Sequence, residues 1–225
     1  MQTPAEQRFT TLIWIKLGIW AGLATCLVYP SLVFLHLPYA GIVVLAAALG
    51  PLLGVAGLGL GRLLQIPRQS VTAKMAVAFT FTAGALVTAM LLVQLAVKAR
   101  AGSSGASPEL VGVWLGLDVA WDVYIGLGTG LFAVAMLRHP RFGPWFGIPG
   151  LAIASLLLVL NLYSFPTPPA DAGLVDLGPL VGLWFLAATV QAWRSLRWAE
   201  TTLALETLGD KAAEAPDTGS AAQGN

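Results

Sequence analysis

Two aspartates, Asp118 and Asp122, are the residues whose type and spacing could do chemistry in this sequence. They lie in the apolar segment 110–137, which is long enough to cross a bilayer. A helix entering the membrane at Leu110 places Asp118 about 12 Å and Asp122 about 18 Å deep, near the middle of a hydrocarbon core about 30 Å thick. The four-residue spacing puts both carboxylates on one helix face. Burying a carboxylate at this depth costs at least about 2.5 kcal/mol, so we expect both to face protein or a water-filled cavity.

Two neighbouring carboxylates disfavour joint ionisation where the dielectric constant is low. The pair could therefore exchange a proton or gain from a bound cation. The alternative is structural: indole N–H groups or tyrosine hydroxyls hold both carboxylates, which then only specify how the helices pack. The sequence leaves both interpretations open.

Composition indicates that lipid surrounds the elements that must position this pair. Of the 225 residues, 57% are hydrophobic and 10% are charged, and the mean hydropathy is +0.78. Soluble domains carry about 25% charged residues. The hydropathy pattern predicts an all-α polytopic membrane protein with six transmembrane helices, at residues 10–29, 39–64, 72–97, 110–137, 145–164 and 175–193. The first of these should end at Tyr29-Pro30, because proline disfavours a helical residue before it.

Basic residues predict which side of the membrane each connection occupies. With the amino terminus inside, only Lys98 and Arg100 fall outside. The inner set is Arg8, Lys16, Arg62, Arg68, Lys74, Arg138, Arg141, Arg194, Arg197 and Lys211. This bias predicts that both termini are cytoplasmic. We therefore expect a cytoplasmic amino terminus at 1–9, a bundle within 10–198 and a disordered cytoplasmic tail at 199–225.

Glycines spaced four residues apart indicate helices that pack closely. The pairs are Gly50/Gly54 and Gly57/Gly61 in the second predicted helix, and Gly112/Gly116 and Gly126/Gly130 in the fourth. Pro51 should kink the second helix and could make it a hinge.

Several classes of function are disfavoured. The net charge of +1, with no basic block, argues against a nucleic-acid partner. The single cysteine, Cys26, allows no intramolecular disulfide and no multi-thiolate metal site, and His36 and His139 should lie on opposite sides of the membrane. Common catalytic motifs are absent from the sequence, and the two carboxylates share one helix instead of facing each other. We therefore expect no enzymatic activity, no metal site and no cofactor.

The predicted topology brings polar residues of several helices into the outer half of the bundle. They should line an outward-facing acidic and aromatic cavity, with the aspartates as binding charges and tryptophans offering cation–π contacts. The predicted ligand-binding residues are Asp118, Asp122, Trp114, Trp121, Asn161, Tyr163, Asp176, Trp184 and Gln94.

Four short segments resemble a bacterial family of six- to seven-helix integral membrane proteins of unknown function. The segments are Asp118-Val-Ala-Trp121-Asp122-Val, Arg138-His139-Pro140-Arg141-Phe142-Gly143, Asn161-Leu-Tyr-Ser-Phe165-Pro166, and Asp176-Leu-Gly178-Pro179 with Trp184. The resemblance covers roughly residues 110–195. It implies no activity, only that these positions form one polar site.

Two functions follow as hypotheses. The first is a multi-pass protein of the bacterial inner membrane that acts as a carrier or receptor for a proton, a cation or a small polar ligand. The alternative is a membrane-embedded regulator, similar in plan to anti-sigma factors, that binds a cytoplasmic protein through residues 194–225. The lipid bilayer is the partner that both hypotheses share.

Overall fold

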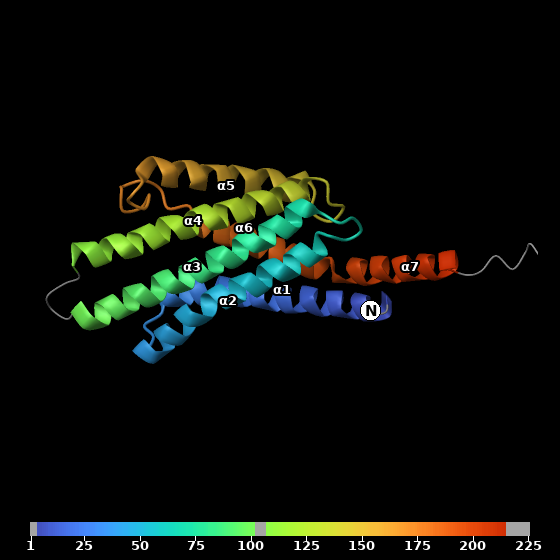
Figure 1. Cartoon of the computed structure of the whole chain (residues 1–225), viewed down its shortest axis with the longest axis horizontal. Helices are drawn as coiled ribbons and strands as arrows, with labels where there is room; N and C mark the ends of the chain where they lie inside the picture. Colours follow the sequence, from blue (N-terminus) through green and yellow to red (C-terminus); the bar gives the residue numbers. More distant parts are fainter. Residues whose placement is uncertain (1–3, 102–106, 215–225) are drawn as a thin grey trace, which may run out of the picture.

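Helices fill nearly all of the chain in the computed structural model, which describes residues 4–101 and 107–214. They are α1 (Pro4–Phe34), α2 (Tyr39–Leu63), α3 (Val71–Ala101), α4 (Pro108–Leu137), α5 (Pro144–Ser164), α6 (Gly178–Arg194) and α7 (Leu196–Glu214). The first six run in alternating directions, so α2, α4 and α6 return to the end where α1 begins (Figure 1). We call the end of the bundle where α1 begins the amino-terminal end, and we call the other end the opposite end.

The bundle is built mainly from neighbours in sequence. From α1 to α5 the main contacts join helices that are consecutive in sequence, and α6 closes the bundle with smaller contacts to α5 and α1. The largest fully buried apolar side chains include Ile15, Leu63, Phe132 and Met136, which all belong to the amino-terminal half. Leu157 of α5, which is also fully buried, lies nearer the opposite end, so most but not all of these side chains lie in that half.

Within the described residues, five helices are long and apolar enough to cross a membrane: α1, α2, α3, α4 and α5. The chain is thus an all-α, multi-helix protein with five candidate membrane spans. The remaining bundle helix, α6, has 17 residues and is not among the five. At about 1.5 Å per residue it is about 26 Å long, close to the lower limit for a span. That α6 is a sixth span, and that both termini are cytoplasmic, stay predictions.

The prediction that the first helix ends at Tyr29 was wrong, because α1 continues through Pro30 to Phe34. If the chain stopped being helical inside lipid, its backbone N–H and C=O groups would have no water to bind. Membrane helices therefore tolerate a proline and continue past it. The hydroxyl of Ser31 donates to the carbonyl of Leu27 at 2.7 Å, beside the position where proline lacks an N–H group. At its other end α1 begins at Pro4, so residues 4–9 of the predicted amino-terminal segment are helical.

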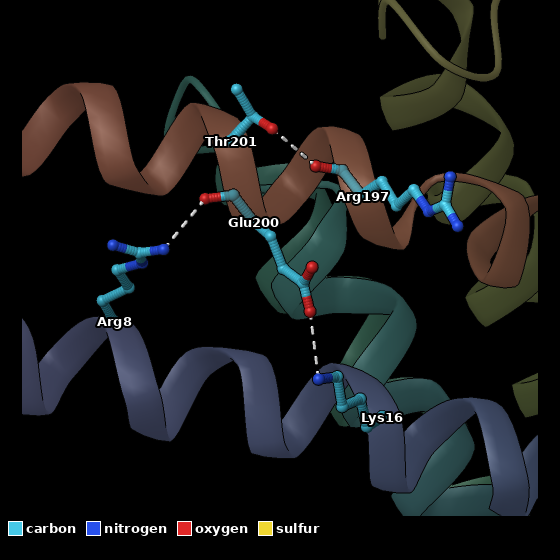
Figure 2. Close-up of polar contacts among 5 residues, drawn as sticks. All are labelled: Arg8, Lys16, Arg197, Glu200 and Thr201. Atoms are coloured by element: carbon cyan, nitrogen blue, oxygen red, sulfur yellow. Dashed lines mark hydrogen bonds and ion pairs between the residues drawn. The ribbon is translucent and has the colours of Figure 1, made fainter.

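The predicted disordered tail from residue 199 was also wrong, because residues 199–214 belong to α7. Leu196, Ala199 and Leu203 pack against the core at helical spacing, and this short apolar face escaped the sequence analysis. Glu200 adds two polar contacts with α1 (Figure 2). Its carboxylate lies 3.0 Å from Lys16 Nζ, and its backbone carbonyl accepts a hydrogen bond of 3.3 Å from Arg8. Residues 215–225 of the predicted tail lie outside the described residues.

Close packing through glycine is confirmed for α2. A Cβ atom added to Gly57 would lie 2.8 Å from Thr80 of α3, and one added to Gly59 would lie 2.8 Å from the Trp14 carbonyl of α1. Real Cβ atoms do not approach other atoms so closely, so larger residues would push these helices apart. The same expectation was wrong for Gly112 and Gly116, because no atom of the described residues lies within 4 Å of such a Cβ.

Candidate functional site: an apolar cavity and a polar pair

A cavity of about 450 Å³ lies in the half of the bundle near the opposite end. Ligand pockets usually occupy about 300–1,000 Å³ and have mainly apolar walls. The wall comes from five parts of the chain: Thr25, Cys26, Tyr29, Pro30 and Phe34 of α1; Leu49 and Leu53 of α2; Val87 of α3; Trp121 and Ile125 of α4; and Asp176, Gly178, Pro179, Val181, Gly182, Leu183, Phe185 and Leu186 in and before α6.

Few polar groups interrupt this apolar wall. Asp176 is the one carboxylate among the lining residues, and it lies exposed where the chain enters α6. Its Oδ1 accepts a hydrogen bond of 2.8 Å from the backbone N–H of Gly178. The indole Nε1 of Trp121 is buried and has no hydrogen-bond partner among the described residues. The cavity wall thus carries one carboxylate, at the start of α6.

Asp122 does not line the cavity but pairs with Asn161 across the contact between α4 and α5. The Nδ2 group of Asn161 donates to Asp122 Oδ2 at 2.9 Å. Both side chains are buried, with 8% of Asp122 and 0% of Asn161 exposed. Burying a carboxylate without any hydrogen bond costs free energy, and the Asn161 amide supplies one such bond. The two predicted residues thus lie together at a contact between helices and not in the wall of the cavity.

The other predicted residues do not converge on one place. Trp184 is buried in the core, where its Nε1 donates to the carbonyl of Phe146 at 2.9 Å, so it is a packing residue. Tyr163 is 80% exposed and faces away from the bundle. Asp118, Trp114 and Gln94 are partly buried and do not line the cavity. Of the nine predicted residues, only Trp121 and Asp176 belong to the cavity wall.

The contribution of α1 to the cavity was not predicted from the sequence. Thr25, Cys26 and Tyr29 all line the cavity, and the hydroxyl of Thr25 donates to the Ala21 carbonyl at 2.8 Å. Their polar atoms recur at helical spacing within an otherwise apolar segment, which was a usable signal. The signal was weak because each of these residue types is also common in ordinary membrane helices.

At the amino-terminal end, His139 joins the connection after α4 to the connection after α2. Its Nε2 lies 2.9 Å from the carbonyl of Ile66, and its Nδ1 accepts from the backbone N–H of Arg141 at 3.2 Å. A carbonyl only accepts and a backbone N–H only donates, so the ring is neutral with its proton on Nε2. Burial lowers the pKa of His139 because it disfavours the charged imidazole, and the nearby Arg141 lowers it further.

No protein-family model matches the chain, and no curated protein or solved structure is similar enough to count as a match. The resemblance to a family of six- to seven-helix membrane proteins therefore gains no support. What the fold supports is a multi-helix protein with five candidate membrane spans.

Among the described residues, no three His, Cys, Asp or Glu side chains come together as metal ligands. The described part of the chain therefore forms no cluster of the kind that zinc prefers.

Proposed function

We propose that this protein is a carrier or receptor in the bacterial inner membrane for a small molecule with an apolar body and a positively charged group. The molecule would occupy the cavity between α1, α2, α4 and α6. The observation that carries the proposal is the cavity itself, an apolar space of about 450 Å³ with the Asp176 carboxylate in its wall. An apolar wall favours an apolar body through burial of its surface, and one carboxylate favours one positive charge.

The charge distribution around the cavity also favours a cation. Asp118, Asp122 and Asp176 lie close enough for their carboxylates to repel one another. Among the described residues, the basic side chains at the opposite end are Lys98 and Arg100, which are exposed at the end of α3. Carboxylates that outnumber nearby basic groups beside an apolar wall attract cations.

One feature of α2 favours a carrier over a receptor. Leu49 and Leu53 both line the cavity, and Pro51 lies between them in the helix. Proline removes one backbone hydrogen bond and weakens the helix locally. Bending of α2 at Pro51 would therefore change the shape of the cavity wall, as alternating access to a ligand requires.

The direct test compares two probes of one shape and different charge, phenyltrimethylammonium and the neutral tert-butylbenzene. Cys26, the single cysteine, lines the cavity and reports occupancy through its rate of reaction with a maleimide. In the purified full-length protein, we expect the cation to slow this reaction and to raise the melting temperature, and the neutral probe to do so much less.

Asp176→Asn should remove the difference between the two probes, because the amide keeps a side-chain oxygen for the Gly178 N–H but loses the charge. The matched control is Asp171→Asn, which changes an exposed carboxylate outside the cavity wall. Equal protection by both probes in the wild type would show that the cavity does not select a cation.

The regulator remains the second candidate because α7 is a helix that extends along α1 beyond the bundle (Figure 1). A cytoplasmic protein could bind this pair of helices. Coprecipitation of one specific cytoplasmic protein, lost on deleting residues 202–225, would favour the regulator. Uptake of the cationic probe into vesicles that is unchanged by this deletion would favour the carrier.

A further inference from the structure

A second polar site lies between α4 and α5, apart from the cavity. It centres on the pair of Asp122 and Asn161, neither of which lines the cavity. Ser164 lies three residues further along α5, on the next turn of the helix. Two oxygens of this group, Asn161 Oδ1 and Ser164 Oγ, are buried without a hydrogen-bond partner among the described residues. Buried polar atoms are nearly always satisfied by protein, water or an ion, so two orphans here indicate a bound species.

The orientation of the Asn161 amide is determined by its neighbours. Its Nδ2 donates to the Leu157 carbonyl at 3.0 Å and to Asp122 Oδ2 at 2.9 Å, which uses both of its hydrogens. A carbonyl oxygen cannot donate, so the atom facing Leu157 must be the nitrogen. Asn161 Oδ1 is therefore a hydrogen-bond acceptor that faces neither Leu157 nor Asp122 Oδ2, and it could bind a positively charged group.

Among the residues that the structure describes, Asp122 has no positive partner either. Within the described part of the chain, no Lys, Arg or His side chain forms an ion pair with it. A neutral amide stabilises a carboxylate by hydrogen bonding but does not balance its charge, and an unbalanced charge inside a membrane protein is costly. A proton could neutralise Asp122, but it would leave the two orphaned acceptors of α5 as they are. A metal cation balances the charge and satisfies these oxygens together.

The packing of α4 on α5 brings one more carboxylate to the same level as Ser164. Gly126 packs on Leu158, and Gly130 packs on Ala154, so the two helices run in opposite directions in this register. Moving one turn from Asp122 to Asp118 on α4 therefore matches moving one turn from Asn161 to Ser164 on α5. Asp118 could therefore contribute a further carboxylate oxygen on the side of the site nearer the opposite end of the bundle.

We infer that Asp122, Asn161 and Ser164 form a binding site for a monovalent alkali-metal cation. All three residues would bind the cation through oxygen atoms, which hard cations prefer. Asp122 is the one carboxylate among the three, and it balances a single positive charge. Trp121, next to Asp122 in sequence, lines the ligand cavity, so a cation here would lie on the helix that also forms the cavity wall. This inference does not depend on the proposed ligand of the cavity.

The test is thermal unfolding of the purified full-length protein in chloride salts of sodium, lithium, potassium and choline at equal concentration and fixed neutral pH. We expect one alkali cation to raise the melting temperature in a saturable way and choline to have no effect. Asp122→Asn should abolish the response. Ser164→Ala removes one ligand oxygen but keeps the Asp122–Asn161 bond, so it should weaken the apparent cation affinity roughly tenfold.

Two further measurements keep the test decisive. If Asp122→Asn fails to fold, equilibrium binding of radioactive sodium and rubidium to wild type and Ser164→Ala gives the answer directly. Ser155→Ala is the control, because it removes an exposed hydroxyl from the same helix and should leave the cation response intact. The inference is overturned if choline stabilises the wild type as well as every alkali cation does, or if Ser164→Ala and Asp122→Asn both keep the full response.

Discussion

The ammonium of Lys16 lies 3.0 Å from the carboxylate of Glu200, and this ion pair joins α1 to α7 across most of the length of the sequence. Figure 2 shows Glu200 between two basic residues of α1, with Arg8 bound to its backbone carbonyl. The long side chain of Lys16 reaches from within α1 to this partner. The contact adds to the apolar packing of Leu196, Ala199 and Leu203 against the core.

The first prediction concerns the strength of this ion pair. Both side chains are about half exposed, 52% for Lys16 and 40% for Glu200, so solvent screens the pair. A double-mutant cycle with Lys16→Met and Glu200→Gln should give a coupling free energy of about 0.2–1 kcal/mol that falls as salt is added. Reversible unfolding in detergent measures it. A coupling that is independent of salt would mean that the pair is shielded from solvent.

The second prediction concerns the pair of Asp122 and Asn161. Asn161→Ala removes the amide and leaves the buried carboxylate without its donor, so it should lower the free energy of unfolding by about 1–3 kcal/mol. Replacing both residues with Leu should cost less than that single change, because no buried polar group is then left alone. Thermal unfolding of both variants decides. A double variant less stable than Asn161→Ala would show that the pair stabilises the bundle in itself.

The third prediction compares two glycines. Gly59 lies against Gly18 and Trp14 of α1, and a Cβ atom there would be 2.8 Å from the Trp14 carbonyl. Gly59→Ala should therefore destabilise the bundle by about 1–3 kcal/mol through overpacking. At Gly112 no atom of the described part of the chain lies within 4 Å of an added Cβ, so Gly112→Ala should leave stability unchanged or raise it by up to about 1 kcal/mol. Equal effects of the two substitutions on the melting temperature would contradict the close contact of α1 with α2.

The fourth prediction concerns pH and follows from His139. Burial holds its pKa in the folded protein below the ordinary value of 6.5, so the unfolded chain takes up a proton first as the pH falls. Between these two pKa values the unfolded state binds more protons, and the free energy of unfolding falls with decreasing pH. The protonated ring would also place a hydrogen on Nδ1 against the N–H of Arg141.

His139→Gln should flatten the dependence of the melting temperature on pH in this window. His36→Gln is the control, because His36 is exposed at the opposite end of the bundle and should leave the dependence as it is in the wild type. A pH profile unchanged by His139→Gln would assign the acid sensitivity to other groups.

The sequence by itself determined the membrane-embedded helices and the local relationships within them. Lipid offers no hydrogen bonds, so an apolar segment of sufficient length must be helical, and five predicted spans coincide with helices in the fold. Helical spacing likewise placed Asp118 and Asp122 on one face, and the glycines of α2 indicated close packing. These properties depend on residues only a few positions apart.

Only the tertiary structure decided which helix each face meets. The pairing of Asp122 with Asn161, the burial of Trp184 against Phe146 and the share of α1 in the cavity all depend on the order and register of packed helices. Hydropathy cannot distinguish these arrangements, because an apolar face is equally satisfied by lipid and by another helix. For the same reason α7 was missed: its short apolar face becomes stabilising only where α1 and the end of the bundle are present to bury it.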